Sequence, residues 1–139
     1  MAFSPTDRAL RLTKETAAAR QVLLAISALE AGHYDAAITL AGAAEGMLAG
    51  DPDIEISTQL LAHPSGKNVE APYTWPEIVN LERNWLKHKT ADGKAPHELT
   101  LDLDNTPFYV FRAMRKLPVD RITSEMLAFE TWYRARLDR

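Results

Sequence analysis

The sequence predicts an all-α fold: a single domain over residues 1–139, built as an up-and-down bundle of four to five helices. Apolar residues recur at helical spacing through most of the chain. Residues that favour helix starts precede several of these segments, and most connections are short. A chain of 139 residues is long enough for one hydrophobic core and too short for two.

The composition is that of an ordinary globular protein, with 46% apolar and 25% charged residues. No apolar run approaches the ~20 residues that span a bilayer, and the first residues do not resemble a secretory signal. We therefore expect a cytoplasmic protein with no membrane partner. The chain has no cysteine, which excludes disulfides and thiolate zinc sites. A net charge of −3 argues against a large nonspecific nucleic-acid footprint, but not against a local one.

The first two predicted helices are rich in alanine. Ser4 and Pro5 form a cap and first-turn pair, and nothing interrupts the helical pattern before Glu30, so one long helix is expected over this range. Gly32 is the expected stop. The second helix is expected to start near Asp35. Its small side chains allow a neighbouring backbone to approach closely, which places this helix at the centre of the bundle.

Glu45 lies on the apolar stripe of the second helix, with Ile38 and Ala41. Burying a carboxylate without a partner is costly, so the sequence predicts a structural buried carboxylate that binds a basic or polar side chain. Arg83 and Trp85 are the first candidates for that partner.

Residues 50–73 carry weaker signals. Turn-forming residues bracket the stretch 54–63, for which a short helix is favoured over a strand. The following stretch, 63–68, has the composition of an exposed loop.

The segment from Thr74 to Thr90 is predicted to be one amphipathic helix. Thr74 and Glu77 form a capping box, and Pro76 occupies the first turn, where its missing N–H costs nothing. The apolar face carries Ile78, Leu81 and Trp85. The end of the segment is the only place where the chain gathers a forked cation, an amide and an imidazole within one and a half turns: Arg83, Asn84, Lys87, His88 and Lys89. Any chemistry is expected there.

Two further helices complete the predicted bundle. The first runs from Thr106 to Leu117, with Thr106 and Pro107 as its cap and first-turn pair. Its predicted buried face carries Val110, Phe111, Met114 and Leu117. The second runs from about Thr123 to Arg136, and its apolar stripe consists of Ile122, Met126, Phe129 and Tyr133.

Several of these segments together resemble a protein family. AAITLAGAAEGML in the second helix, ERNWLKH in the third, TPFYVFRAM and ITSEMLAFETWY are similar to a compact bacterial branch of the HEPN superfamily (higher eukaryotes and prokaryotes nucleotide-binding). The hallmark of that superfamily is an Arg followed after four to six residues by a His, often with a polar residue directly after the Arg. Arg83, Asn84 and His88 fit this pattern.

The resemblance implies an all-helical, HEPN-like domain that forms a homodimer. In catalytic members it implies metal-independent endoribonuclease activity, with two Arg–His motifs facing a shared cleft. Arg83 would then stabilise the phosphate, His88 would act as general acid or base, and Asn84 would orient the imidazole or the phosphate. The resemblance also implies RNA, a nucleotidyltransferase or an antitoxin as a partner, in a toxin–antitoxin or defence system. Imidazole and guanidinium are chemically suited to these roles.

Helical geometry and charge qualify this interpretation. Arg83 and His88 are about 140° apart on a regular helix, so they converge only if the helix ends before His88 or a second chain completes the cleft. Lys87, Lys89 and Lys94 form a small basic cluster that would attract an RNA backbone. The alternatives are a structural role for the motif and a noncatalytic helical adaptor or dimerisation domain that binds a partner protein or a small ligand.

A metal site is not expected. His63 and His97 are loop histidines, and no ligand spacing brings them together with His88 or with a carboxylate such as Glu98. The sequence indicates no cofactor, since it contains neither a Gly-rich phosphate loop nor a zinc-binding pattern.

Overall fold

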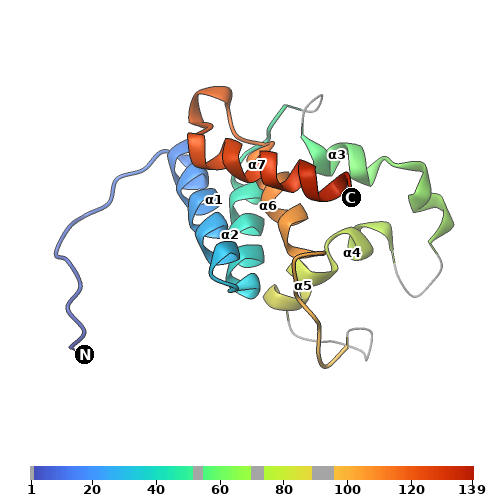
Figure 1. Ribbon diagram of the computed structural model, residues 1–139, viewed down its shortest axis with the longest axis horizontal. Coiled ribbons are helices and arrows are strands. Elements are labelled where there is room, and N and C mark those ends of the chain that lie inside the picture. The colour runs from blue at the N-terminus through green and yellow to red at the C-terminus, as the bar shows by residue number, and fades with distance from the viewer. Residues whose placement is uncertain (1, 52–54, 70–73, 89–95) are drawn as a thin grey trace.

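The computed structural model describes residues 2–51, 55–69, 74–88 and 96–139. Within these ranges the protein is all-α, as predicted, and no residue lies in a β-strand. No helix in the same ranges is long and apolar enough to cross a membrane. The described residues form seven α-helices and two short 3-10 helices (Figure 1): α1 (Lys14–Glu30), α2 (Tyr34–Met47), α3 (Ile56–Leu61), η1 (Pro64–Asn68), α4 (Trp75–Val79), α5 (Leu81–Lys87), α6 (Thr106–Met114), η2 (Val119–Arg121) and α7 (Ser124–Leu137).

The helices α1 and α2 form a hairpin around which the core is built. Gly32 closes the turn between them at a φ of 80°, a conformation that glycine adopts without strain. The backbone N–H of His33 donates to the carbonyl of Ala28 at 2.8 Å, which satisfies one of the last carbonyls of α1.

The helix α2 occupies the centre of the bundle, as its small side chains predict. It packs against α1, α6 and α5. Ala37, Ala41 and Ala44 are almost fully buried along it. Asp35, the expected cap, instead lies in the first turn, where its Oδ1 accepts from the backbone N–H of Ala36 at 2.9 Å.

The start of the first helix differs from the prediction. The helix begins at Lys14, with Thr13 as its N-cap: the Thr13 hydroxyl accepts from the backbone N–H of Thr16 at 3.1 Å. Residues 2–13 are exposed and not helical. The cap signal at Ser4 is local, whereas most helix stability in proteins comes from packing an apolar face, and none of residues 2–13 is buried.

The predicted continuous helix after Thr74 is two short helices. The capping box is confirmed, because the Thr74 hydroxyl accepts from the backbone N–H of Glu77 at 3.3 Å and donates to its carboxylate at 3.0 Å. The helix then breaks at Asn80, which has φ −116° and ψ 24°. The cause is Arg112, which donates to the carbonyl of Val79 at 3.1 Å and to the side chain of Asn80 at 2.7 Å.

The last two helices have nearly the predicted positions. The helix α6 ends at Met114 instead of Leu117, because the chain continues as a tighter turn in which the N–H of Leu117 donates to the carbonyl of Met114 at 3.1 Å. Asn105, one residue before the expected cap, is its N-cap residue. The helix α7 begins at Ser124, directly after the predicted start at Thr123, which is its N-cap, and it buries the predicted residues Met126, Phe129 and Tyr133.

The weakly predicted stretch contains the expected short helix, α3. The expected loop over residues 63–68 is exposed for the most part, but five of its residues form the 3-10 helix η1. The imidazole Nδ1 of His63 caps η1 by accepting from the backbone N–H of Ser65 at 3.1 Å.

Candidate functional site

The candidate site centres on α5, which is held on both sides. Its inner side packs against α2. On its other side, the indole N–H of Trp85 donates to the carbonyl of Pro96 at 2.7 Å. These contacts fix the position of the helix that carries Arg83, Asn84, Lys87 and, at its end, His88.

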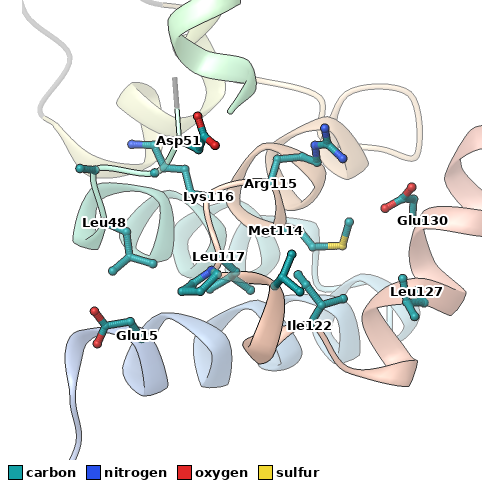
Figure 2. A pocket seen from close by; sticks show the side chains of 14 residues that line it. Glu15, Leu48, Asp51, Met114, Arg115, Lys116, Leu117, Ile122, Leu127 and Glu130 are labelled. Carbon is teal, nitrogen blue, oxygen red and sulfur yellow. The ribbon is translucent and has the colours of Figure 1, made fainter. Parts of the chain in front are cut away.

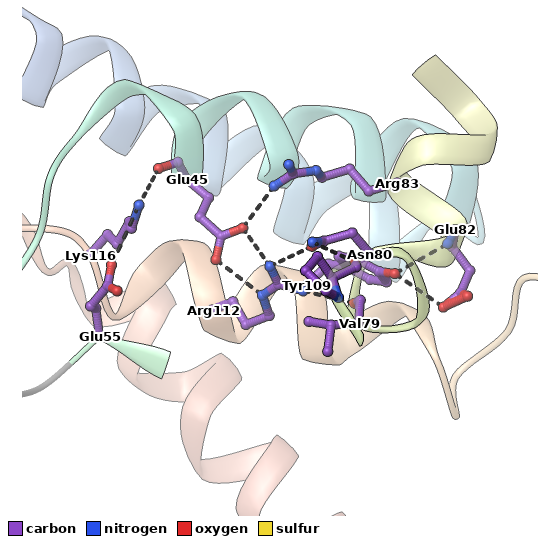
Figure 3. Close-up of polar contacts among 10 residues, drawn as sticks. Glu45, Glu55, Val79, Asn80, Glu82, Arg83, Tyr109, Arg112 and Lys116 are labelled. Carbon is purple, nitrogen blue, oxygen red and sulfur yellow. Dashed lines mark hydrogen bonds and ion pairs between the residues drawn. The ribbon is translucent and has the colours of Figure 1, made fainter. Parts of the chain in front are cut away.

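Glu45 is buried, as predicted, and binds two guanidinium groups (Figure 3). Arg112 donates from Nε to Oε2 at 3.0 Å and from Nη2 to Oε1 at 2.9 Å. Arg83, one of the two predicted partners, donates from Nη1 to Oε1 at 3.0 Å. Trp85, the other, does not bind Glu45. The buried carboxylate is thus satisfied by three charge-assisted hydrogen bonds.

Arg112 is the central residue that sequence reasoning missed. Its side chain is only 2% exposed, and its donors are taken up by Glu45, by Asn80 and by the carbonyl of Val79. The prediction missed Arg112 because this residue lies outside the predicted apolar stripe of α6, and only residues of the stripe were expected to be buried. One signal could have revealed it: apart from Arg112, the α6 sequence TPFYVFRAM contains no charged residue, and Glu45 needed a buried cation.

Gly42 explains how Arg83 reaches Glu45. A Cβ atom at position 42 would lie 2.6 Å from Cδ and 2.9 Å from Cγ of Arg83. The aliphatic part of Arg83 therefore crosses α2 where the helix has no side chain. The glycine is needed for this close approach.

Lys116 extends the network to the end of α2. Its ammonium group donates to the backbone carbonyl of Glu45 at 2.9 Å and pairs with the carboxylate of Glu55 at 3.4 Å. Both carboxylates are almost fully buried, with exposed fractions of 4% for Glu45 and 2% for Glu55. Three cations thus hold two buried anions at the contact of α2, α5 and α6.

Tyr109 and Glu82 join α6 to the first turn of α5. The Tyr109 hydroxyl donates to the Glu82 carboxylate at 3.1 Å and accepts from the Glu82 backbone N–H at 3.2 Å. Burial, together with the nearby negative charge of Glu82, raises the pKa of Tyr109 to about 12. Burial also raises the pKa of the Glu82 carboxyl, because it disfavours the charged form.

The other predicted site residues lie at the end of α5. The helix ends at Lys87, and His88 is its C-cap with extended backbone angles of φ −117° and ψ 156°. Lys87 and His88 are exposed, and Asn84 is half-buried. The backbone N–H of His88 donates to the carbonyl of Asn84 at 2.9 Å. The helix therefore ends before His88, one of the two conditions under which convergence with Arg83 was expected.

The end of α5 and the guanidinium of Arg83 lie in different surroundings. Asn84, Lys87 and His88 follow one another at the end of the helix, whereas Nη1 of Arg83 is directed to Glu45. Within residues 74–88, no hydrogen bond joins the side chains of Arg83, Asn84 and His88. The predictions for Lys89 and Lys94 lie outside the described residues.

The loop histidines are apart from this site. His63 caps η1, and His97 is exposed, as is Glu98. In the part of the chain that the structure describes, no three His, Asp or Glu side chains are grouped so that they could hold a metal ion.

Comparisons with known proteins give no relationship. No family model matches the sequence, and neither curated proteins nor solved structures match the chain.

Proposed function

We propose that this protein is a HEPN-like domain that binds RNA and cleaves it as a homodimer without a metal ion, within a cytoplasmic toxin–antitoxin or defence system. The observation that carries the proposal is the end of α5. There the chain leaves the helix at His88, so that an exposed imidazole directly follows the exposed ammonium group of Lys87 and lies about one turn from Asn84.

The chemistry needs only groups that this region supplies. His88 takes the proton of a ribose 2′-hydroxyl as that oxygen attacks the adjacent phosphorus. The His88 of a second copy gives a proton to the departing 5′-oxygen. The products are a 2′,3′-cyclic phosphate and a 5′-hydroxyl end. Lys87 attracts the phosphate backbone, and the Asn84 amide orients the phosphate or the imidazole.

Arg83 has two roles in this proposal. One N–H of its guanidinium is held by Glu45, and 28% of the side-chain surface remains exposed. A guanidinium carries five N–H groups, so others are left for a phosphate oxygen. Glu45 then fixes the orientation of the group that stabilises the charge of the transition state.

The homodimer brings two α5 ends to one cleft. A symmetric contact is proposed because two-fold dimers dominate homo-oligomers and because each copy supplies one imidazole. A nucleotidyltransferase or an antitoxin is the proposed protein partner, since such partners accompany the family that the sequence resembles. Light scattering at high micromolar concentration should show a dimer, and a monomer there would contradict a shared cleft.

The test is RNA cleavage in chelator by the full chain. A single-stranded RNA should be cut to products with cyclic phosphate ends, and the same strand with 2′-deoxy sugars should stay intact. His88→Ala should abolish cleavage. His97→Ala is the matched control, because His97 is also an exposed histidine, and it should retain activity. Circular dichroism verifies that both variants are folded.

One observation favours a second candidate, a noncatalytic adaptor that binds a partner protein or a small ligand. The Arg83–Glu45 ion pair gives the arginine of the motif a structural role without any substrate. If the folded protein neither cleaves RNA nor retains it at low salt, the adaptor replaces the ribonuclease proposal.

A further inference from the structure

A groove of about 580 Å³ lies between the last turns of α1 and the first turns of α7. Trp132 of α7, which is 41% exposed, and the half-buried Tyr34 at the start of α2 contribute aromatic rings to it. The rest of its uncharged lining is apolar: Ile26, Leu29, Leu103, Ala128 and Phe129. A groove of this volume and composition is typical of a site for a small molecule.

The charged side chains that line this groove, among the described residues, are both carboxylates: Glu30 and Glu125. Both are exposed, and neither forms a salt bridge with a described residue. Glu125 contacts neutral groups. The Ser124 hydroxyl donates to its Oε2 at 3.4 Å, and a hydrogen bond from its own backbone N–H lowers the pKa of its carboxyl. The groove therefore presents two negative charges that no described cation balances.

The position of Glu30 in α1 favours a bound cation. Glu30 lies in the last turn of the helix, and that turn contains no basic residue. The C-terminal end of a helix carries a partial negative charge, so it attracts cations and disfavours a carboxylate. A cation beside Glu30 is thus stabilised by the carboxylate and by the helix end together.

One cation of the chain lies beside the groove without lining it. The guanidinium carbon of Arg136 is 5.8 Å from the centroid of the Trp132 ring, and its Nη2 is 3.1 Å from Oδ1 of Asp104. Asp104 therefore balances the charge of Arg136. A compact cation enclosed by aromatic faces fits this groove poorly, because Arg136 already lies over the Trp132 ring and Phe129 is only 6% exposed.

A second groove, of about 830 Å³, has no such preference for one sign of charge (Figure 2). Its lining combines cations and anions: Glu15, Asp51, Arg115, Lys116 and Glu130. A groove that carries both signs does not select a cationic ligand. It provides a matched control, because Glu15 is an exposed glutamate on the same helix as Glu30.

We propose that the groove between α1 and α7 binds a polyamine, a chain of methylene groups that carries ammonium groups. The ammonium groups pair with Glu30 and Glu125, and the methylene groups cover the apolar lining. The α7 side of the groove extends from Glu125 to Trp132, which is about 10 Å along the helix and leaves room for several methylene groups. A hard metal ion is a poorer occupant, because it needs several oxygen ligands and most of this lining is apolar.

The polyamine site does not depend on the proposed ribonuclease activity. None of the residues that line the groove belongs to α5, which carries Arg83, Asn84 and His88. Binding is measured with the protein alone and without RNA. Either proposal can therefore fail without the other.

Isothermal titration calorimetry of the full chain with spermidine at low salt tests the site. Saturable binding of one spermidine per chain is expected. Glu30→Gln and Glu125→Gln should each weaken it about fivefold, the upper end of the range for the loss of an exposed ion pair. Glu15→Gln removes the same charge from the other groove and should leave the affinity unchanged. Butylamine, which has one ammonium group, should bind more weakly than putrescine, which has two.

The three tryptophans provide a readout of the position of the ligand. The indole N–H of Trp75 donates to the carbonyl of Leu60, and that of Trp85 donates to the carbonyl of Pro96, so both lie outside the groove. In a heteronuclear NMR spectrum, spermidine should shift the indole signal of Trp132 and leave those of Trp75 and Trp85 in place. Trp132→Phe assigns the signal.

Several results would overturn the proposal. It is wrong if spermidine does not bind saturably, or if the Trp132 signal does not move. Equal losses for Glu30→Gln and Glu15→Gln would show that spermidine responds only to the net charge of the protein. Equal binding of butylamine and putrescine would exclude the pairing with two carboxylates. A chain that binds no amine but forms a dimer that Trp132→Glu dissociates would show that a second copy covers the groove instead.

Discussion

The inner side of α5 and the end of α5 carry similar polar groups in opposite surroundings. On the inner side, the Arg83 guanidinium binds Glu45, which is itself held by the buried Arg112. At the end of the helix, Lys87 and His88 are exposed. A buried charge must be paired because desolvation is costly, whereas an exposed cation keeps its water and remains able to bind a ligand. The motif of α5 thus divides into an anchored arginine and an accessible lysine and imidazole.

The largest expected effect comes from removing the anion on the inner side. Glu45→Ala leaves Arg112, with a side chain only 2% exposed, without its counter-charge. Breaking a buried pair in this way should lower the free energy of unfolding by about 3–5 kcal/mol, measured by urea denaturation.

The control for this experiment is an exposed pair. Asp120→Ala removes the partner of Arg121 on the surface, and it should change stability by less than about 1 kcal/mol. If Glu45→Ala proves too unstable to purify, Glu45→Gln provides the measurement, because it keeps the shape and removes the charge. Similar losses for Glu45→Gln and Asp120→Ala would contradict the difference between the two environments.

The sequence predicted the features of this region that depend on near neighbours. The Thr74 capping box is set by residues three positions apart, so a local pattern reveals it. The burial of Glu45 followed from the period of α2. Its second partner did not, because Arg112 is 67 positions away and lies outside the apolar stripe of its own helix.

Two other features depended on tertiary contacts that no local pattern contains. The helix breaks at Asn80 because Arg112 binds the carbonyl of Val79. The break therefore could not be predicted without the position of the Arg112 side chain. The segment that begins at Ser4 has a helix-start signal, but its residues up to Thr13 are exposed, and a cap alone does not stabilise a helix. The accessible end of α5 was recognised from residue types, and the pairing of Arg83 with Glu45 was predicted from the burial of Glu45. The close approach of Arg83 to the backbone of α2 at Gly42 was not predicted.

The Tyr109–Glu82 contact gives the anchored side a pH dependence. The pKa of Tyr109 is raised from 10 to about 12, so the folded state holds this proton more tightly than the unfolded state. Its contribution to stability is complete below pH 10 and is lost as the pH rises toward about 12. Tyr109→Phe should cost about 1 kcal/mol below pH 10, since it removes a buried hydrogen bond, and the difference from the unaltered protein should shrink at higher pH.

Urea denaturation of both proteins across this range measures the change. Taking the difference between them removes the effect of the other groups that titrate at alkaline pH. A constant difference from pH 10 to about 12 would show that Tyr109 titrates normally and that the contact with Glu82 is not maintained in solution.

A pair of glycines on α2 gives a smaller but sharper test of how Arg83 is anchored. Gly46 is exposed, with no atom within 4 Å of an added Cβ, so Gly46→Ala should stabilise the helix by about 0.5–1 kcal/mol. Gly42→Ala brings the same gain in helix propensity, but it places a methyl group 2.6 Å from Cδ of Arg83. It should be less stable than Gly46→Ala by about 1 kcal/mol or more in thermal or urea denaturation. Equal stabilisation would show that Arg83 moves away from α2 without cost.

The smallest expected effect on stability lies at the accessible end of α5, and it should coincide with the largest effect on RNA. Lys87 and His88 are exposed, and neither side chain forms a hydrogen bond with a described residue, so Lys87→Ala and His88→Ala should change the free energy of unfolding by no more than about 0.5 kcal/mol. If Lys87 contacts a phosphate, its removal weakens RNA binding. It also lowers by about 1 the slope of the logarithm of the binding constant against the logarithm of the salt concentration.

Lys67→Ala is the matched control, since Lys67 is also an exposed lysine in the last turn of a short helix, η1. Fluorescence anisotropy with a labelled single-stranded RNA, over a series of salt concentrations, measures both slopes. Equal slopes for Lys87→Ala, Lys67→Ala and the unaltered protein would remove the end of α5 from the RNA contact, and the difference between the two environments of α5 would then be one of stability alone.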